Sequence, residues 1–479
     1  MSFFSSRILL LVFALLTCFA HYGGSDQTIR AKFLFSDKTA YHFLNTSVSK
    51  PEKYDPVYIN MVIRHGSRYP SKSRVQAMSK ILEVLNAFFP VNQTYKATFR
   101  YKGLSLPWNI PADVRYAANK ELSSLGAQEM YWIAKRIRAK FPEIFKDDYA
   151  DTRYSFIGSD KLRSSQSAVA FAQGIFEHQG PVGISKYQPI AVKVSGPAGA
   201  DQILRVHEAC PKWKKMNAKI SHNEYAKFIH GPQVQNVTDD IYSRLNLKSK
   251  IKPSSKVVME LFLMCAFSTQ TDSNDVSLCS LFEDEDLKVL EYLNDLKMYW
   301  SYSYGRKINY RMVCPLYVKI TDSFLQYIRR GKPYGVFQFA HTGTVLPLLT
   351  LLGLYKDDLP LRADNFDKQT NRTFRPSNIV PMSANIAFVL YDRRRNDTNH
   401  SRNGDMKQKR TISTMMIQVL VNEVAVKIPA CSGKTYCRLK KFLDYYSHIK
   451  KRCNINRICG RLRGNCQNVR KRAGKRGSD

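Results

Sequence analysis

The stretch that most constrains the fold of this chain runs from residue 57 to residue 70 and reads VYINMVIRHGSRYP. Its first half, Val57 to Ile63, is a short apolar run rich in β-branched residues. Such a run is typical of a buried parallel strand. In open α/β sheets, ligands bind at the carboxyl ends of the strands. We therefore expect the side chains that follow this strand, Arg64, His65 and Arg68, to lie in a binding site.

The same order of strand, polar turn and helix recurs twice. Residues 154–158 predict a strand, and Arg163 stands at the turn before a helix expected over 164–177. Residues 335–341 predict a third strand, which ends at His341 and is followed by a helix over 342–352. The apolar spacing also predicts helices over 73–89 and 121–141, and closing strands over 385–391 and 414–421.

Between these units the chain loses its strand pattern. Helical segments are expected over 213–229, 239–247, 255–267 and 284–300. The fold class is therefore α/β, with a mainly parallel sheet, flanking helices and an inserted α-helical cap subdomain. We expect a discontinuous α/β domain over 21–180 and 331–432, with residues 21–54 as a polar surface lead-in. The cap would span 181–330, and a basic C-terminal extension would span 433–479.

The N-terminus predicts export from the cell. Residues 1–20 contain a charged start, the apolar run Ile8 to Leu16 and small residues before Ala20, the pattern of a cleaved signal peptide. The run is shorter than the roughly 20 apolar residues that a membrane span needs. Glycosylation sequons agree with a secreted glycoprotein, and they lie at Asn45, Asn92, Asn236, Asn371, Asn396 and Asn399.

Cysteine usage points to disulfide bonds. After Cys18 the chain has nine cysteines, and none is spaced as in a zinc site. Short spacing favours the pairs Cys265–Cys279, Cys431–Cys437 and Cys453–Cys459, although spacing alone leaves the connectivity open.

The formal net charge of +35 calls for a polyanionic partner, an anionic surface or solubility at low pH. Specific nucleic-acid binding is not favoured, because the chain has no recognition-helix, zinc-finger or aromatic RNA-binding pattern. The extension from 433 is the most basic part and has only Asp444 and Asp479 as acids. It is either a solvated tail or an anchor for anionic glycans or membranes.

The residues at the three strand ends suit phosphoryl transfer. Arginine grips phosphate oxygens with a planar fork of donors, and several arginines neutralise the charge of the transferring group. A histidine among them can attack phosphorus and carry the phosphoryl group as a covalent intermediate. This chemistry requires no metal and no cofactor.

The segment RHGSRYP at 64–70 resembles the signature of the histidine acid phosphatases. Residues 290–305 and 346–353 are similar to the multiple inositol polyphosphate phosphatase branch of that family. The resemblance implies a six-stranded, mainly parallel sheet with a helical cap, a Cys265–Cys279 disulfide and an inositol polyphosphate substrate. It further implies His65 as the nucleophile of a phosphohistidine intermediate, with Arg64, Arg68, Arg163 and His341 holding the phosphoryl group.

One position departs from that pattern. The branch is expected to carry His-Ala-Glu after the third strand, and other acid phosphatases His-Asp, and this acid protonates the leaving alkoxide. Here Thr342 and Gly343 follow His341. General acid catalysis contributes about 10² to 10⁴-fold, so its loss would slow hydrolysis of alkyl phosphates. If the missing acid limits the rate, Gly343→Glu should raise turnover.

Two functions follow: a secreted inositol polyphosphate phosphatase with weakened activity, or an impaired phosphatase-like protein that binds inositol phosphates or other polyanions.

Overall fold

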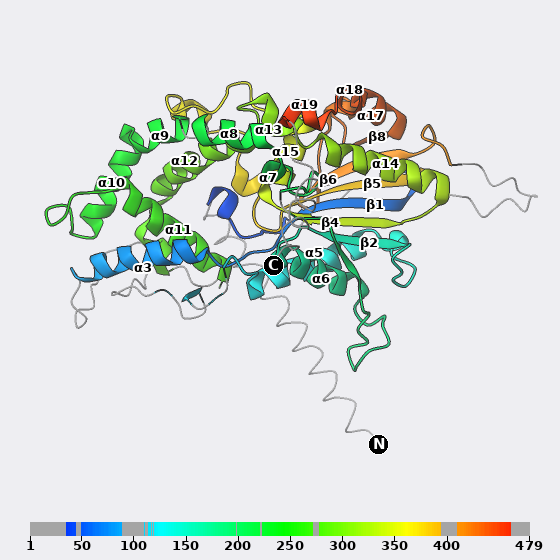
Figure 1. Cartoon of the computed structure of the whole chain (residues 1–479), viewed down its shortest axis with the longest axis horizontal. Helices are drawn as coiled ribbons and strands as arrows, with labels where there is room; N and C mark the ends of the chain where they lie inside the picture. The colour runs from blue at the N-terminus through cyan, green and yellow to red at the C-terminus, as the bar shows by residue number, and fades with distance from the viewer. Residues whose placement is uncertain are drawn as a thin grey trace, which may run out of the picture.

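The computed structural model describes residues 35–44, 49–88, 110, 114–115, 117, 119–197, 199–220, 223–271, 277–393 and 410–460. They form a sheet with helices on both faces and, beside it, a mainly helical part (Figure 1). The predicted signal peptide and the end of the predicted extension, 461–479, lie outside the described residues.

The sheet has eight described strands rather than the six expected, in the order β3-β2-β4-β1-β5-β6-β7, with β8 paired to β6. The strands β3, β2, β4 and β1 run parallel, and the rest pair antiparallel. Their bounds are β1 Tyr54–Arg64, β2 Tyr154–Gly158, β3 Val192–Val194, β4 Gly335–Ala340, β5 Asn385–Arg393, β6 Met416–Val421, β7 Val424–Ala425 and β8 Tyr436–Arg438. The predicted α/β class is confirmed.

Strand β1 lies in the middle of this sheet and is buried from Tyr58 to Arg64. Ile59, Met61 and Ile63 face a core formed with the helices α5 (Ser124–Lys140) and α6 (Leu162–Phe176). Tyr58 and Val62 face the opposite core, where the ring of Tyr58 contacts Phe324 of α14 (Cys314–Arg330). Burial on both faces explains why the run is apolar at almost every position, Asn60 excepted.

The helical part lies beside the sheet in Figure 1 and contains α3 (Lys72–Asn86) and α8 to α12. The bounds are α8 Pro211–Ile220, α9 Asn223–Ile229, α10 Pro232–Arg244, α11 Ser255–Thr271 and α12 Asp284–Tyr302. Helix α3 packs against α11, and Arg74 forms an ion pair with Glu260 there. The predicted cap range 181–330 thus holds α8 to α12 but not α3, and it also includes β3 and α14, which pack with the sheet.

Four disulfides join the described residues, and two of them correct the sequence prediction. Cys265–Cys279 and Cys431–Cys437 form as expected. The Cys453–Cys459 pair is wrong, because Cys453 bonds Cys314 and Cys459 bonds Cys210. These long-range bonds hold the segment with α18 (Ser447–Lys451) and α19 (Ile455–Cys459) against α14 and α8. The described start of the predicted extension is therefore folded onto the protein, through β8, α17 (Leu439–Tyr445), α18 and α19.

The polar lead-in is also placed differently from the prediction. Phe35 is 1% exposed and its ring packs edge-on against Phe262 of α11. The short 3-10 helix η1 (Ser36–Lys38) follows it and lies between α12 and α16 (Pro376–Ile379). Residues 35–41 are therefore part of the interior rather than of the surface.

Among the described residues, no helix is both long and apolar enough to cross a membrane.

Candidate active site

The loop that follows β1 is held against the start of α5 by an unusually close backbone contact. A Cβ atom on Gly66 would lie 2.3 Å from the carbonyl oxygen of Gly126, so a larger residue cannot be accommodated without a backbone shift. The amide of Ser123 donates to the carbonyl of Ser67, and the amide of Tyr69 donates to that of Glu121. These contacts fix the direction in which His65 leaves the strand.

A buried carboxylate completes this support. Glu129, 8% exposed, accepts hydrogen bonds from the backbone amide and hydroxyl of Ser67, both at 2.8 Å. It also accepts from the hydroxyl of Ser383 at 2.6 Å and from the amide of Tyr41 at 3.0 Å. One carboxylate therefore ties the loop after β1 to the loop before β5 and to the N-terminal segment.

The tautomer of His65 is set by its own loop. Its Nδ1 lies 2.9 Å from the carbonyl oxygen of Gly66. A carbonyl oxygen only accepts, so Nδ1 must carry the proton. In the neutral imidazole the lone pair is then on Nε2, which is the atom free to attack an electrophile.

The surroundings of His65 favour this neutral form. Burial lowers its pKa well below the usual value, and the nearby cations Arg163, Arg64 and Arg68 and the ring of His341 lower it further. The five residues predicted from three separate strand ends are thus brought together around one imidazole. A histidine with a depressed pKa stays a nucleophile even in mildly acidic solution.

His341 follows β4 and lies beside His65, with ring centroids 5.3 Å apart and the rings edge to face. Its Nδ1 lies 3.3 Å from a guanidinium nitrogen of Arg163, and its Nε2 lies 2.9 Å from the hydroxyl of Ser159. Arginine only donates, so Nδ1 accepts and Nε2 carries the proton in the neutral ring. Burial and the charge of Arg163 lower the pKa of His341 well below its usual value, which agrees with a neutral ring.

Arg64 is 2% exposed and is anchored rather than free to swing. Its guanidinium donates to the carbonyl oxygens of Asp37 at 2.7 Å and Val380 at 2.8 Å. The carboxylate of Asp37 lies 3.6 Å away and forms a tighter pair, 2.7 Å, with Lys38. Burial alone would raise the pKa of Asp37, but Lys38 and Arg64 lower it to about 2.

The other two arginines are short of counter-charge. Burial lowers the pKa of Arg68 to about 9, and Arg163 and Arg64 add to this effect. Burial also lowers the pKa of Arg163 to about 10, with Arg205 as a further cause. The guanidinium of Arg68 lies 5.7 Å from the ring of Phe267 in α11, so the helical part forms one wall of the site. Crowded, desolvated arginines of this kind favour binding of an anion.

The position expected to carry the acid is filled by other side chains. A Cβ atom on Gly343 would lie 2.8 Å from Nδ1 of His207 and 2.9 Å from the ring of Tyr302. Both neighbours are rings with little freedom to move. Thr344 offers no replacement, because its hydroxyl donates to the carbonyl of Leu204.

His207 itself is a titratable group at the edge of the site. It lies in the short helix α7 (Val206–Ala209), and its ring centroid is 6.3 Å from that of His341. Its Nδ1 is buried and makes no hydrogen bond of normal geometry among the described residues, although the backbone of Gly343 lies close enough to raise the pKa of the ring; its Nε2 lies 3.9 Å from the carboxylate of Glu208. Burial lowers the pKa of His207 to about 4, although Glu208 acts in the opposite direction.

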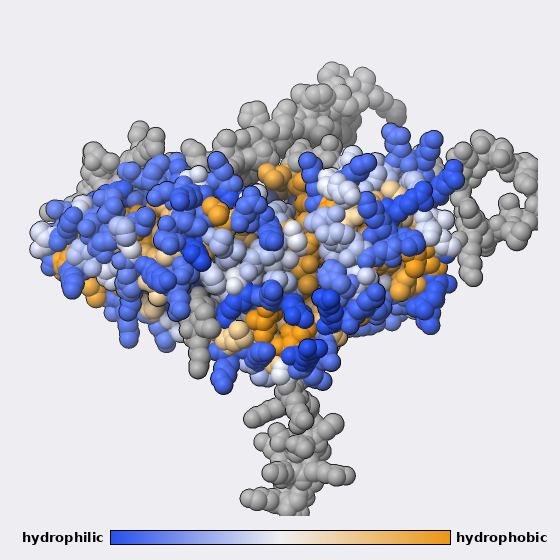
Figure 2. All heavy atoms as spheres, turned by 90° about the horizontal axis from the view of Figure 1, so that it is seen from above, coloured by the Kyte–Doolittle hydropathy of each residue, from blue (hydrophilic) through white to orange (hydrophobic). Residues whose placement is uncertain are grey.

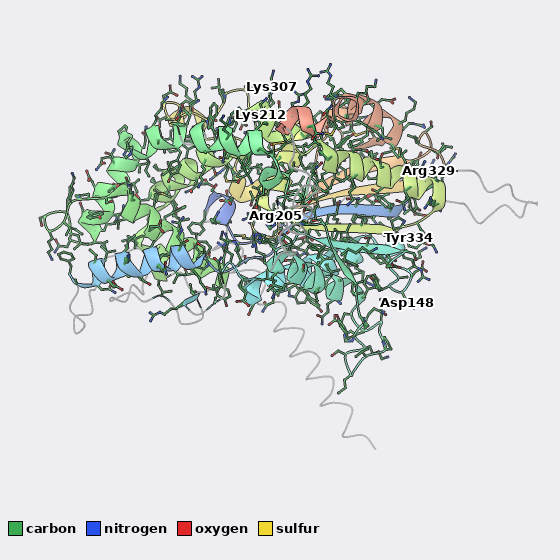
Figure 3. The ribbon with its side chains drawn as sticks, viewed as in Figure 1. Asp148, Arg205, Lys212, Lys307, Arg329 and Tyr334 are labelled. Atoms are coloured by element: carbon green, nitrogen blue, oxygen red, sulfur yellow. A yellow bond between two sulfur atoms is a disulfide. The ribbon has the colours of Figure 1, made fainter. Side chains whose placement is uncertain are left out.

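Sequence reasoning missed Asp37, Lys38, Arg205 and His207. Arg205, 3% exposed, lies in the interior between the helical part and the sheet (Figure 3) and pairs with Asp160 and Glu208. The predicted site residues each follow an apolar strand, and none of these four residues does. Only the fold brings their segments to the carboxyl end of β1.

No cluster of histidine, cysteine or acidic side chains suited to a metal ion occurs in the described parts of the chain.

The chain is similar to known phosphatases over most of its length. The family model of the histidine phosphatase superfamily (branch 2) matches residues 57–422. Multiple inositol polyphosphate phosphatase 1 of Homo sapiens is 30% identical over 423 residues, covering 86% of this chain and 82% of the human protein. The Drosophila melanogaster protein of the same name is 30% identical over 405 residues, covering 81% of this chain and 83% of its own.

Two solved structures share the fold. The phytase from D. castellii superposes with a TM-score of 0.70 at 17% identity, covering 91% of this chain and 88% of that chain. The Bifidobacterium longum multiple inositol polyphosphate phosphatase in complex with inositol hexasulfate gives a TM-score of 0.61 at 16% identity, covering 85% and 96%. The resemblance inferred from residues 64–70 is thereby confirmed, and the chain belongs to the histidine phosphatase superfamily, branch 2.

Proposed function

We propose that this protein hydrolyses inositol polyphosphates, phytate among them, through a phosphohistidine formed on His65. The observation that carries the proposal is the state of His65, whose Nδ1 faces a carbonyl so that Nε2 keeps its lone pair within a ring of arginines. The sequence relatives named as inositol polyphosphate phosphatases support this substrate class.

In the first step the Nε2 atom of His65 attacks phosphorus, and the bond from phosphorus to the alkoxide breaks as the nitrogen–phosphorus bond forms. Arg64, Arg68 and Arg163 neutralise the charge on the non-bridging oxygens, and His341 holds Arg163 in position. In the second step water attacks the phosphohistidine, the nitrogen–phosphorus bond breaks, and inorganic phosphate leaves.

The leaving alkoxide needs a proton, and we assign its source to His207. This side chain fills the space that a carboxylic acid at position 343 would occupy, and its unpartnered Nδ1 faces that space. Glu208, 3.9 Å from Nε2, stabilises the protonated ring. A polyanion bound nearby raises the pKa of His207, because its negative charge stabilises the protonated ring and offsets the surrounding cations. In the second step the phosphate keeps the proton of the attacking water, and His207 regains its proton from the solvent.

A second function, binding of polyanions with little turnover, is favoured by one specific observation. Because the pKa of His207 is about 4 in the free protein, most of the molecules carry a neutral His207 at neutral pH. Such molecules would bind the phosphates and lack the donor. Para-nitrophenyl phosphate, whose leaving group departs without a proton, would then be cleaved while phytate is only bound.

Phosphate release from phytate by the purified full chain tests the proposal, with His65→Ala as the inactive variant. Release by the unaltered chain that His65→Ala abolishes supports the phosphohistidine mechanism. Release that persists in His65→Ala contradicts it. Tight binding of phytate without phosphate release, together with cleavage of para-nitrophenyl phosphate, supports the second function.

We also propose that the chain is exported as a glycoprotein, since four disulfides join its described residues and the sequons at Asn236 and Asn371 lie on exposed positions. Recovery of the chain from culture medium, with a loss of mass after glycosidase treatment, tests this. Retention of all the protein inside the cells would contradict it.

A further inference from the structure

An open basin lined by cations lies away from His65, between α8, α13 (Lys307–Arg311) and the segment around α18 and α19. Its volume is about 880 Å³. Seven of its lining residues are cations: Lys212, Arg306, Lys307, Arg311, Lys451, Arg452 and Arg457. Figure 3 shows Lys212 and Lys307 close together on the outer side of the helical layer, whereas Arg205 lies deeper.

The walls of this basin are covalently fixed. Cys210, directly before α8, bonds Cys459 at the end of α19. Cys314, at the start of α14, bonds Cys453 between α18 and α19. The two disulfides therefore clamp the segment carrying Lys451, Arg452 and Arg457 against the helices that carry the other four cations. Cations on a mobile tail would not keep such an arrangement.

No acidic side chain lines the basin, and no described acidic group forms an ion pair with any of its seven cations. Arg306 donates to the carbonyl of Trp300, but its Nη1 is buried with no partner among the described residues. Six of the seven cations are exposed and Arg306 is half-buried, whereas the less exposed Arg372 and Arg375 pair with Asp295 and Glu291. The uncompensated positive potential of the basin therefore favours an anionic ligand.

The basin is separate from the active site and shares a wall with it. None of Arg64, His65, Arg68, Arg163 and His341 lines it. Lys212 faces the basin, whereas the next residue, Trp213, is buried, with its ring centroid 5.3 Å from Tyr302 and 6.1 Å from His207. The indole of Trp213 donates to the carbonyl of Ser301 at 3.0 Å, which fixes this wall.

From this geometry we propose that the basin is a second, non-catalytic site for a compact anion bearing several phosphate groups. Its volume is that of a site for a small molecule, and small-molecule sites commonly enclose about 300–1,000 Å³. Its cations come from three directions, so they can engage phosphates on several sides of one molecule. An extended polyanion such as a sulfated glycan would contact the rim and leave the remaining cations unused. The proposal does not depend on turnover at His65.

Calorimetric titration of the full-length His65→Ala variant with myo-inositol hexasulfate tests it, because this probe carries no phosphate ester to hydrolyse. The comparison variant adds Lys307→Glu, Arg311→Glu and Arg457→Glu. The matched control adds Lys250→Glu, Lys256→Glu and Lys434→Glu, which make the same charge change at exposed positions outside the basin. Thermal unfolding confirms that all three variants are folded.

Two binding sites are expected for His65→Ala and for the control, and one site for the basin variant. At the second site the affinity should fall by at least about tenfold for each charge-assisted contact removed. The basin variant in the otherwise unaltered chain should keep its turnover of para-nitrophenyl phosphate. A single site in every variant, or an equal loss in the control, would overturn the proposal. It would also be overturned if the basin variant lost binding of a heparin octasaccharide and kept both hexasulfate sites, because the basin would then serve extended glycans.

Discussion

The ring of His207 occupies the space that a side chain on Gly343 would need, since a Cβ atom there would lie 2.8 Å from Nδ1 of His207. The acid that the family is expected to carry at position 343 and the histidine observed here thus exclude each other sterically. The sequence alone predicts that Gly343→Glu should raise phytate turnover, whereas this contact predicts the opposite.

We now expect Gly343→Glu alone to lower phytate turnover, because the new side chain collides with His207 and Tyr302. The double variant His207→Gly, Gly343→Glu exchanges the two groups and removes the closer of the two collisions, leaving Tyr302 to move aside. Its phytate turnover, measured by phosphate release, should exceed that of either single variant. A double variant no better than Gly343→Glu would show that the space at position 343 is unrelated to proton donation.

Replacing His207 by Asn should act on the leaving group selectively. We expect phytate turnover to fall by about 10² to 10⁴-fold, because that is the usual contribution of a general acid. Turnover of para-nitrophenyl phosphate should change by less than about tenfold, since this leaving group needs no proton. His178→Asn, at an exposed histidine, is the matched control. Equal losses on both substrates would assign His207 a merely structural role.

The pH dependence of phytate hydrolysis should carry the same signature. Protonated His207 is the donor, so its protonated fraction falls as the pH rises above a pKa of about 4 in the free protein. The value of kcat/KM, which reports the free enzyme, should therefore decline with rising pH, and His207→Asn should remove this decline. A decline that remains unchanged in His207→Asn would contradict the assignment.

Acid should destabilise the free protein through the same buried histidines. The pKa values of His207, His65 and His341 are lower in the folded chain than in the unfolded chain, because burial opposes their protonation. Below about pH 6.5, which is the pKa of a histidine in the unfolded chain, the unfolded chain binds more protons than the folded chain. The free energy of unfolding therefore decreases as the pH falls from about 6.5 through the lower pKa values of the folded chain. Thermal unfolding at about pH 7 and about pH 4.5 measures this loss, which should be smaller in His207→Asn. The same melting temperature at both pH values would contradict the conclusion that these histidines are buried and neutral in the folded chain.

Gly66→Ala should disrupt the catalytic loop. The added methyl group would lie 2.3 Å from the carbonyl oxygen of Gly126, so the loop or α5 must shift. We expect a stability loss of about 1–3 kcal/mol and a larger loss of activity, because His65 directly precedes Gly66 in the chain. Gly199→Ala, where no atom lies within 4 Å of the added methyl, should change neither quantity. A fully active Gly66→Ala would show that the close contact has no role in positioning His65.

The parts of the site that follow apolar strands were predictable from the sequence. Strands β1 and β4 are buried and pair in parallel, so both give mainly apolar runs, interrupted only by Asn60 and Gln338, that are followed by His65 and His341. The sequence could not locate Asp37 or His207, because their segments are short and polar and reach the site only through tertiary packing. It also misassigned Cys453 and Cys459: spacing suggested that they pair, whereas the fold directs one toward α14 and the other toward α8.

Trapping the covalent intermediate tests most directly whether His65 is the nucleophile. The full chain would be mixed with radiolabelled phytate, quenched within one turnover and digested, and the labelled peptide identified by mass spectrometry. A phosphoryl group is expected on His65 of the unaltered chain, and no labelled peptide is expected from His65→Ala. Label on a residue other than His65, or phosphate release without any trapped label and undiminished in His65→Ala, would contradict it.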